Sequence, residues 1–176
     1  MAWRNSEVGY GAFTRLIHWL MALSIIGMLI FGTIIARMRF TLDNLWVYQV
    51  HKSIGLTLLI LVVLRLIWHR VSPPPGHLPM PKLQALAARS VHIALYLLML
   101  AVPLTGWIAS AASGIDTVFW GMTVPGIAPV SEAWENGFFK AHDLLTKAMI
   151  GLLVLHIAGA LTHGIAIKRM ITGTST

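Results

Sequence analysis

Apolar residues dominate this chain in four long runs that are separated by shorter polar stretches. The runs cover about residues 16–36, 47–68, 91–112 and 144–167. A membrane-spanning helix needs about 20 mostly apolar residues, and each run reaches that length. The pattern therefore predicts an all-α fold, an integral membrane four-helix bundle of up-down-up-down type that forms a single domain over residues 1–176.

The connections between the runs fit this prediction. Residues 72–81 read SPPPGHLPMP, which favours an extended linker because proline cannot continue a helix. Residues 82–90 are a polar helical lead-in to the third run. The longest connection, 113–143, contains Gly, Pro and Trp throughout. Aromatic side chains gather at membrane interfaces, so we expect this segment to lie on the membrane surface.

The composition narrows the function classes. Hydrophobic residues make up 57% of the chain and charged residues 11%, against about 25% charged in soluble domains. The basic residues flank the apolar runs, which indicates a lipid environment and no nucleic-acid partner. The chain has no cysteine, which excludes iron–sulfur clusters and the attachment of a c-type haem. A redox cofactor would therefore need histidine or methionine ligands.

The distribution of charge predicts an orientation. Eight of the 13 basic residues fall on the side of the two termini, while five of the six acids fall on the other side. Cytoplasmic loops carry the excess of Lys and Arg. We therefore expect both termini in the cytoplasm and the connections 37–46 and 113–143 on the outer side.

Histidine is the most informative residue type in this chain. Of eight histidines, six lie in or at the edges of the apolar runs: His18, His51, His92, His142, His156 and His163. The other two, His69 and His77, are expected to be solvated. A single membrane histidine can simply bond a neighbouring carbonyl group. Six together favour a functional role, because ionisable groups in a membrane are costly.

Depth in the membrane predicts how the histidines pair. His142 and His156 are 14 residues apart, which is a rise of about 21 Å and a rotation that returns to within about 40°. Both therefore face one side of the fourth helix, at two depths. His51 is expected beside His142 on the outer side, and His18 beside His156 on the inner side. Two imidazoles fill the axial positions of a haem iron, so the pairs predict two bis-histidine haem b groups.

The inner pair has alternatives. His163 lies seven residues beyond His156 on nearly the same face, and His92 opens the third run; either could replace an inner ligand. His142 and His163 would be about 31 Å apart, nearly the whole hydrocarbon core, and this favours His156. We interpret His163 and His92 as neighbours of the inner haem or of a quinone site.

Cations and glycines near these histidines have two interpretations each. Arg15 and Arg65 are predicted either to pair with haem propionates or to serve as positive-inside anchors. Lys52 and Lys140 flank the outer ligands and are predicted to attract a small anion, or else to bind lipid phosphates or propionates. Glycines within the runs leave room for a macrocycle or for close helix packing: Gly27, Gly55, Gly106, Gly151 and Gly159.

Several segments resemble the prokaryotic cytochrome b561 family. They are RLIHW at residues 15–19, HKSIG at 51–55, LRL at 64–66 before the proline-rich linker, AH at 141–142 and GLLVLH at 151–156. The resemblance implies a four-helix di-haem b protein of the bacterial inner membrane, with His18, His51, His142 and His156 as ligands. One branch of the family oxidises superoxide at the outer face and reduces ubiquinone, and this chain is similar to that branch in length.

The resulting hypothesis is a superoxide:ubiquinone oxidoreductase, with ubiquinone as electron acceptor and superoxide or another outer donor as its partner. One alternative is a cytochrome b subunit that links a dehydrogenase or hydrogenase to the quinone pool. Another, of a different class, is a haem-free proton-coupled transporter that uses its histidines as a relay. A visible spectrum separates the last alternative, because such a transporter would be colourless.

Overall fold

The structure is a computed structural model that describes residues 2–76, 79–162 and 164–173. Its regular elements are mostly helical: α1 (Ala12–Ile35), the short 3₁₀ helix η1 (Leu42–Asn44), α2 (Leu45–Val71), α3 (Lys82–Ala112), β1 (Thr117–Phe119), β2 (Met122–Val124), α4 (Glu132–Thr162) and α5 (Gly164–Thr172). Four helices, α1 to α4, are long and apolar enough to cross a membrane. The prediction of a four-helix membrane bundle is thereby confirmed.

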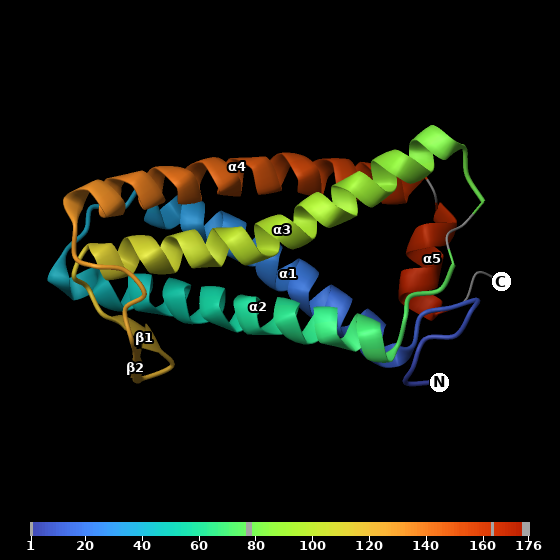
Figure 1. The fold of residues 1–176 in the computed structure, drawn as a ribbon, viewed down its shortest axis with the longest axis horizontal. Helices are drawn as coiled ribbons and strands as arrows, with labels where there is room; N and C mark the ends of the chain where they lie inside the picture. The colour runs from blue at the N-terminus through green and yellow to red at the C-terminus, as the bar shows by residue number, and fades with distance from the viewer. Residues whose placement is uncertain (1, 77–78, 163, 174–176) are drawn as a thin grey trace.

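The four long helices pack as two hairpins. α1 contacts α2, α3 runs beside α4, and α2 also packs on α3. Figure 1 shows that consecutive long helices run in opposite directions, with the N-terminal segment and α5 at the same end of the bundle. The side of the membrane that each end faces stays a prediction, and we name the α5 end the inner end and the β-hairpin end the outer end after that prediction.

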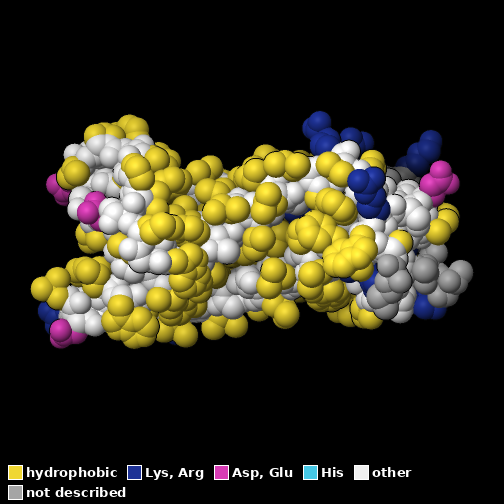
Figure 2. All heavy atoms as spheres, turned by 90° about the horizontal axis from the view of Figure 1, so that it is seen from below, with side chains coloured by type: hydrophobic (Ala, Val, Ile, Leu, Met, Phe, Trp, Pro, Cys, Tyr) yellow, Lys and Arg dark blue, Asp and Glu magenta, His cyan; other side chains and the backbone are white. Residues whose placement is uncertain are grey.

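Lipid-facing side chains give the bundle an apolar exterior and a small protein core. The central buried cluster is Ile17, Met21 and Val62, with partly buried neighbours such as Tyr96 around it. Figure 2 shows hydrophobic side chains along the length of the bundle. On this face the Lys and Arg side chains gather mainly at the α5 end, and most acidic side chains lie at the opposite end.

The helices extend beyond the apolar runs, and the largest differences lie at the fourth run. α4 begins at Glu132, twelve residues before the predicted start at 144, so the last part of the connection 113–143 is helical. The fourth run, predicted to reach 167, is divided between α4, which ends at Thr162, and α5, which begins at Gly164.

A short β-hairpin is docked against the outer half of α2. β1 and β2 are antiparallel, with Val118 opposite Thr123. Trp120 and Gly121 between them both have positive φ, 47° and 94°, as a tight two-residue hairpin turn requires. The Ser53 hydroxyl of α2 donates to the carbonyl of Val118 at 2.8 Å and accepts from the backbone N–H of Trp120 at 3.1 Å.

α5 closes the inner end of the bundle together with the N-terminal segment. Arg169 is buried and donates to the carbonyls of Gly76 and Val8, each at 3.1 Å. Its guanidinium also lies 5.6 Å from the ring centre of Tyr10. Burial raises the pKa of Tyr10 above its ordinary value of 10.0, and the charge of Arg169 acts in the opposite direction. These contacts, which we call the inner clasp, tie the N-terminal segment and the linker 72–81 to α5 through one side chain.

Candidate functional site

Two pairs of histidines lie inside the bundle, one pair at each end, and the two rings of each pair face each other. His18 of α1 and His156 of α4 have ring centres 6.3 Å apart. His51 of α2 and His142 of α4 have ring centres 6.4 Å apart. The structure therefore brings together the same pairs that depth along the helices predicts, with α4 contributing one histidine to each.

The spacing within each pair fits a haem iron. A ligating imidazole nitrogen lies about 2 Å from its metal and about 1.1 Å from its own ring centre, so two rings on opposite sides of one iron have centres about 6.2 Å apart. The observed 6.3 and 6.4 Å agree with this separation. The ring separations therefore suit bis-histidine haem at both ends, which would be held through His18 and His156, and through His51 and His142.

Hydrogen bonding prepares His142 as a ligand. Its Nδ1 atom lies 2.8 Å from the carbonyl oxygen of Val102. A carbonyl only accepts, so Nδ1 carries the proton and the lone pair remains on Nε2. This bond also fixes the orientation of the ring, as the outer partners of metal-bound histidines commonly do. Across the pair, Nδ1 of His51 is buried and has no hydrogen-bond partner among the described residues.

Glycines allow the outer histidine rings to lie close to neighbouring helices. A Cβ atom at Gly106 of α3 would lie 3.1 Å from Cε1 and Nδ1 of His142. A Cβ at Gly32 of α1 would lie 3.3 Å from Cε1 of His51. The sequence singles out Gly106 as room for a macrocycle or for helix packing, whereas the structure places the His142 ring there. Gly32 does not stand out in the sequence, because a glycine next to a histidine of another helix leaves no local signal.

The inner pair has a different set of neighbours. Nη2 of Arg65 lies 3.2 Å from Nδ1 of His18. His92 has its ring centre 5.2 Å from that of His156, which is shorter than the separation of two rings that share an iron. His92 is therefore a side neighbour of the inner pair, and His18 faces His156 at the spacing that an iron requires. The alternative ligand His163 lies outside the described residues.

His69 departs from its expected solvated position. α2 continues to Val71, so His69 is still helical, one turn beyond Arg65. Its Nε2 atom is buried and has no hydrogen-bond partner in the described part of the chain. Its ring lies edge-on to Tyr96, with 6.0 Å between the centres.

The predicted cations occupy separate places. Lys52, next to His51, has its Nζ 3.5 Å from the carbonyl oxygen of Asp116. Lys140 is exposed on α4, two residues before His142. Arg65 lies at the inner pair. Arg15 instead donates to the carbonyl of Ile171 at the end of α5, so its described contact belongs to the inner clasp.

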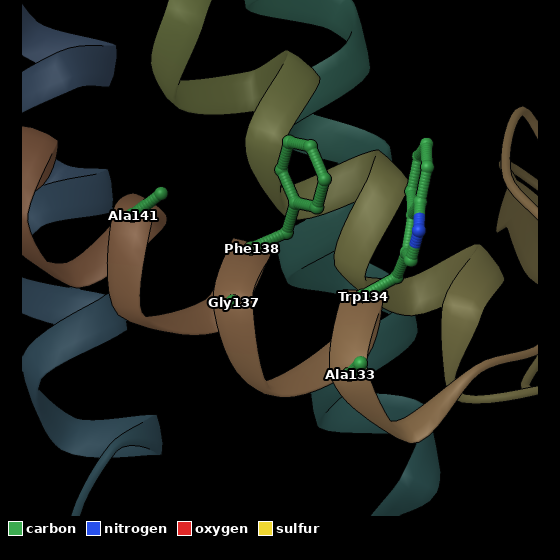
Figure 3. A pocket seen from close by; sticks show the side chains of 5 residues that line it. All are labelled: Ala133, Trp134, Gly137, Phe138 and Ala141. Atoms are coloured by element: carbon green, nitrogen blue, oxygen red, sulfur yellow. The ribbon is translucent and has the colours of Figure 1, made fainter.

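An open hollow lies on α4 just before His142. It measures about 310 Å³ and is lined by Ala133, Trp134, Gly137, Phe138 and Ala141. Figure 3 shows the Trp134 and Phe138 side chains projecting to the same side of α4, and their ring centres are 5.5 Å apart. The lining has no charged side chain, so the hollow suits a hydrocarbon chain better than a polar head group.

Comparison with known proteins gives consistent matches. Residues 9–173 match the family described as prokaryotic cytochrome b561. The chain is 33% identical to cytochrome b561 homolog 2 of Escherichia coli (strain K12), in an alignment that covers 100% of this chain and 98% of that protein. It is 34% identical to cytochrome b561 homolog 1 of the same strain, over 65% of this chain and 66% of the relative. It is 26% identical to a probable superoxide oxidase, CybB, of Yersinia pestis, over 70% of each protein.

Proposed function

Since this chain belongs to the prokaryotic cytochrome b561 family of membrane electron-transfer proteins, we propose that it carries two haem b groups, oxidises superoxide at its outer face and reduces ubiquinone. The proposal places it in a bacterial inner membrane. Haem b is implied by the family, and this argues against the haem-free transporter.

The observation that carries the proposal is the distance between the two histidine rings at each end of the bundle. Each pair has the ring separation that one iron between two imidazoles requires, 6.3 Å at the inner end and 6.4 Å at the outer end. Haem b held by His18 with His156, and by His51 with His142, would supply reversible one-electron transfer in preference to oxygen binding. The helices keep the two pairs apart, because His142 and His156 are separated by about 21 Å of rise along α4.

The reaction balances with two donors for each acceptor. Two superoxide anions give up one electron each and leave as dioxygen. One ubiquinone takes the two electrons together with two protons and leaves as ubiquinol. The contribution of the chain is to hold the cofactors at fixed depth, to guide the anion and to exclude water from the path between the two ends.

Cations near the outer pair support superoxide as the donor. Lys52 directly follows His51, and Lys140 lies two residues before His142. A small anion approaching the outer face would be drawn toward these charges. The relative named as a probable superoxide oxidase supports the same donor, at 26% identity.

The test is a stopped-flow experiment with the purified holoprotein. A superoxide source should reduce the haem groups on the time scale of stopped-flow mixing, followed by visible absorption. A short-chain ubiquinone added afterwards should reoxidise them and be converted to ubiquinol. Added superoxide dismutase should abolish the reduction. If the protein is reduced no faster than a His51→Ala/His142→Ala variant that lacks the outer pair, superoxide is not the donor.

A further inference from the structure

Arg65 holds His18 in a form that cannot bind iron through Nε2. The guanidinium group has only donors, and its Nη2 lies 3.2 Å from Nδ1 of His18. Nδ1 must therefore accept this hydrogen bond, which leaves the proton of a neutral imidazole on Nε2. His142 is in the opposite form, because its Nδ1 donates to the carbonyl of Val102. The two ends of the bundle thus differ in readiness for a metal.

Arg65 is also the centre of a group of polar atoms without a hydrogen-bond partner in the part of the chain that the structure describes, each of which can donate to an anion. Its own Nε, the hydroxyl of Tyr96 and Nε2 of His69 are all buried and have no hydrogen-bond partner within the described residues. The guanidinium carbon lies 5.7 Å from the Tyr96 ring centre, and the Tyr96 and His69 rings are 6.0 Å apart. Arg65 and His69 are one helical turn apart on α2, so both reach the same part of α3. We call these three residues the donor cluster.

The charge of the donor cluster has no counter-ion in the structure. Among the described residues, the ion pair that is formed is Lys147 with Asp143, at the far end of the bundle. Arg65 is half-buried with its Nε atom covered, and a guanidinium held among apolar helices is costly unless an anion pairs with it. A planar carboxylate matches both needs, since it carries the charge and offers two oxygens to several donors. A neutral acceptor would leave the charge of Arg65 unbalanced.

We propose that the donor cluster is a carboxylate site that takes a propionate of the inner haem, and that Arg65 releases His18 for iron binding only when this carboxylate arrives. The proposal rests on the two-haem part of the proposed function. Arg65 turns from Nδ1 of His18 to the propionate, joined by Tyr96 and His69 as further donors. The His18 proton then moves from Nε2 to Nδ1 by exchange with water, with no net gain or loss, and Nε2 presents its lone pair. The outer pair needs no such step at His142.

A comparison of haem b with its dimethyl ester tests this coupling. The ester has the same macrocycle and iron but no carboxylate. The full chain is produced without haem, kept in detergent micelles and titrated with each compound. The amount bound per chain is measured from the visible absorption spectrum. The inner site of the wild-type chain should bind the ester about tenfold to a hundredfold more weakly than haem, the loss expected for charge-assisted hydrogen bonds. In an Arg65→Met variant most of the gap between haem and ester should be lost, because the guanidinium no longer pairs with the carboxylate or contacts His18, and the part that remains should come from Tyr96 and His69.

Further variants protect the test against misfolding. Tyr96→Phe and His69→Phe each remove one donor and should narrow the gap between haem and ester several-fold, while Arg65 still contacts His18. Arg89→Met is the matched control, because it removes an exposed positive charge from α3, and it should preserve the full gap. An added fatty acid such as oleate should not help the ester. If oleate restores tight ester binding, the occupant is a lipid carboxylate and the haem assignment is wrong.

The tautomers can also be observed without any haem. In a chain labelled with ¹⁵N-histidine, two-bond nitrogen–proton couplings report which ring nitrogen carries the proton. We expect Nε2–H at His18 and Nδ1–H at His142, and a change at His18 to a mixture in Arg65→Met. Equal binding of haem and ester to both sites of the wild-type chain would overturn the proposal while leaving the two-haem function standing. Binding of one haem per chain would overturn both. If superoxide fails to reduce the holoprotein, only the identity of the electron donor is wrong, and the carboxylate site is unaffected.

Discussion

The Nδ1 atom of His142 donates to the carbonyl oxygen of Val102 on the facing helix, across 2.8 Å. Val102 precedes Pro103, and the Thr105 hydroxyl shares the same carbonyl at 2.9 Å. The bond is possible because residue 106 is glycine, which leaves the space that the imidazole occupies. The geometry of a predicted iron ligand on α4 is therefore set by the backbone of α3.

Replacing Gly106 with alanine should weaken the outer site. The new methyl group would lie 3.1 Å from the His142 ring, so the ring must shift and its bond to Val102 must lengthen. Overpacking of this kind costs about 1–3 kcal/mol. We expect about tenfold or greater loss of affinity for one of two haems, measured by titration of the haem-free chain.

Gly151→Ala is the matched control for this substitution. A Cβ at Gly151 would meet nothing within 4 Å, and nine residues of helix place it on the side of α4 opposite His142. Alanine should leave both haems in place and slightly stabilise the helix. Equal haem loss in the two variants would show that helix distortion, and not the His142 ring, explains the effect.

The ligand assignment on α4 predicts a specific pattern of haem loss. The two pairs share no residue, so His156→Ala should leave one haem b per chain, and His142→Ala should leave the other. Pyridine haemochrome analysis of the wild-type protein should give close to two per chain. His163→Ala should keep both and slow the reduction of quinone. If His163→Ala loses a haem while His156→Ala keeps two, the inner ligand on this part of the chain is His163 and not His156.

The features that follow from helix geometry are those that the sequence predicts well. The length of each apolar run predicts the four long helices, and the pitch of α4 predicts that His142 and His156 share a face at two depths. The structure places His51 and His18 opposite them, because antiparallel neighbours bring equal depths together. These relationships depend on rise and rotation along a helix, and no knowledge of side-chain packing is needed.

The features that depend on tertiary contacts are those that the sequence misses. α4 begins at Glu132, since charged residues at a membrane surface lower hydropathy without preventing a helix. The hairpin is held by the Ser53 hydroxyl, and the sequence around Ser53 gives no signal for this contact with a distant segment. His69 looks like the end of an apolar run, yet one further turn of α2 brings its ring against Tyr96 of another helix.

The inner clasp should loosen at alkaline pH through Tyr10. Burial raises the pKa of Tyr10 above 10.0, so the folded chain holds this proton more tightly than the unfolded chain. The contribution to stability is complete below pH 10.0, the ordinary value, and is lost as the pH rises toward the higher folded pKa. Tyr10→Phe cannot lose a proton and should escape this loss.

Thermal unfolding between about pH 9 and about pH 11 measures the effect. The difference in Tm between Tyr10→Phe and the wild-type protein should shift in favour of the variant as the pH rises. Other tyrosines and lysines titrate in the same range, but they do so in both proteins and cancel in the difference. A difference that stays constant over the range would mean that Tyr10 ionises as freely in the folded protein as in the unfolded chain.

Steering of an anion by the outer cations predicts a salt-dependent rate. Lys52→Gln and Lys140→Gln should each slow the reduction of the holoprotein by superoxide about two- to fivefold at low salt, because a nearby charge raises the local concentration of a small anion. High salt should slow the wild-type protein and reduce these differences, since the screening length falls from about 10 Å at 0.1 M to about 3 Å at 1 M.

Lys147→Gln is the matched control for steering, because it changes the net charge by the same amount. Lys147 already pairs with Asp143 at 2.6 Å, so its charge is largely balanced locally, and its removal should affect the rate less than the loss of Lys52. If all three variants are equally slow, the overall charge of the outer face attracts the anion. If reduction is fast and independent of salt in all of them, superoxide reaches the outer pair by diffusion alone, and Lys52 and Lys140 serve to bind lipid phosphates or propionates instead.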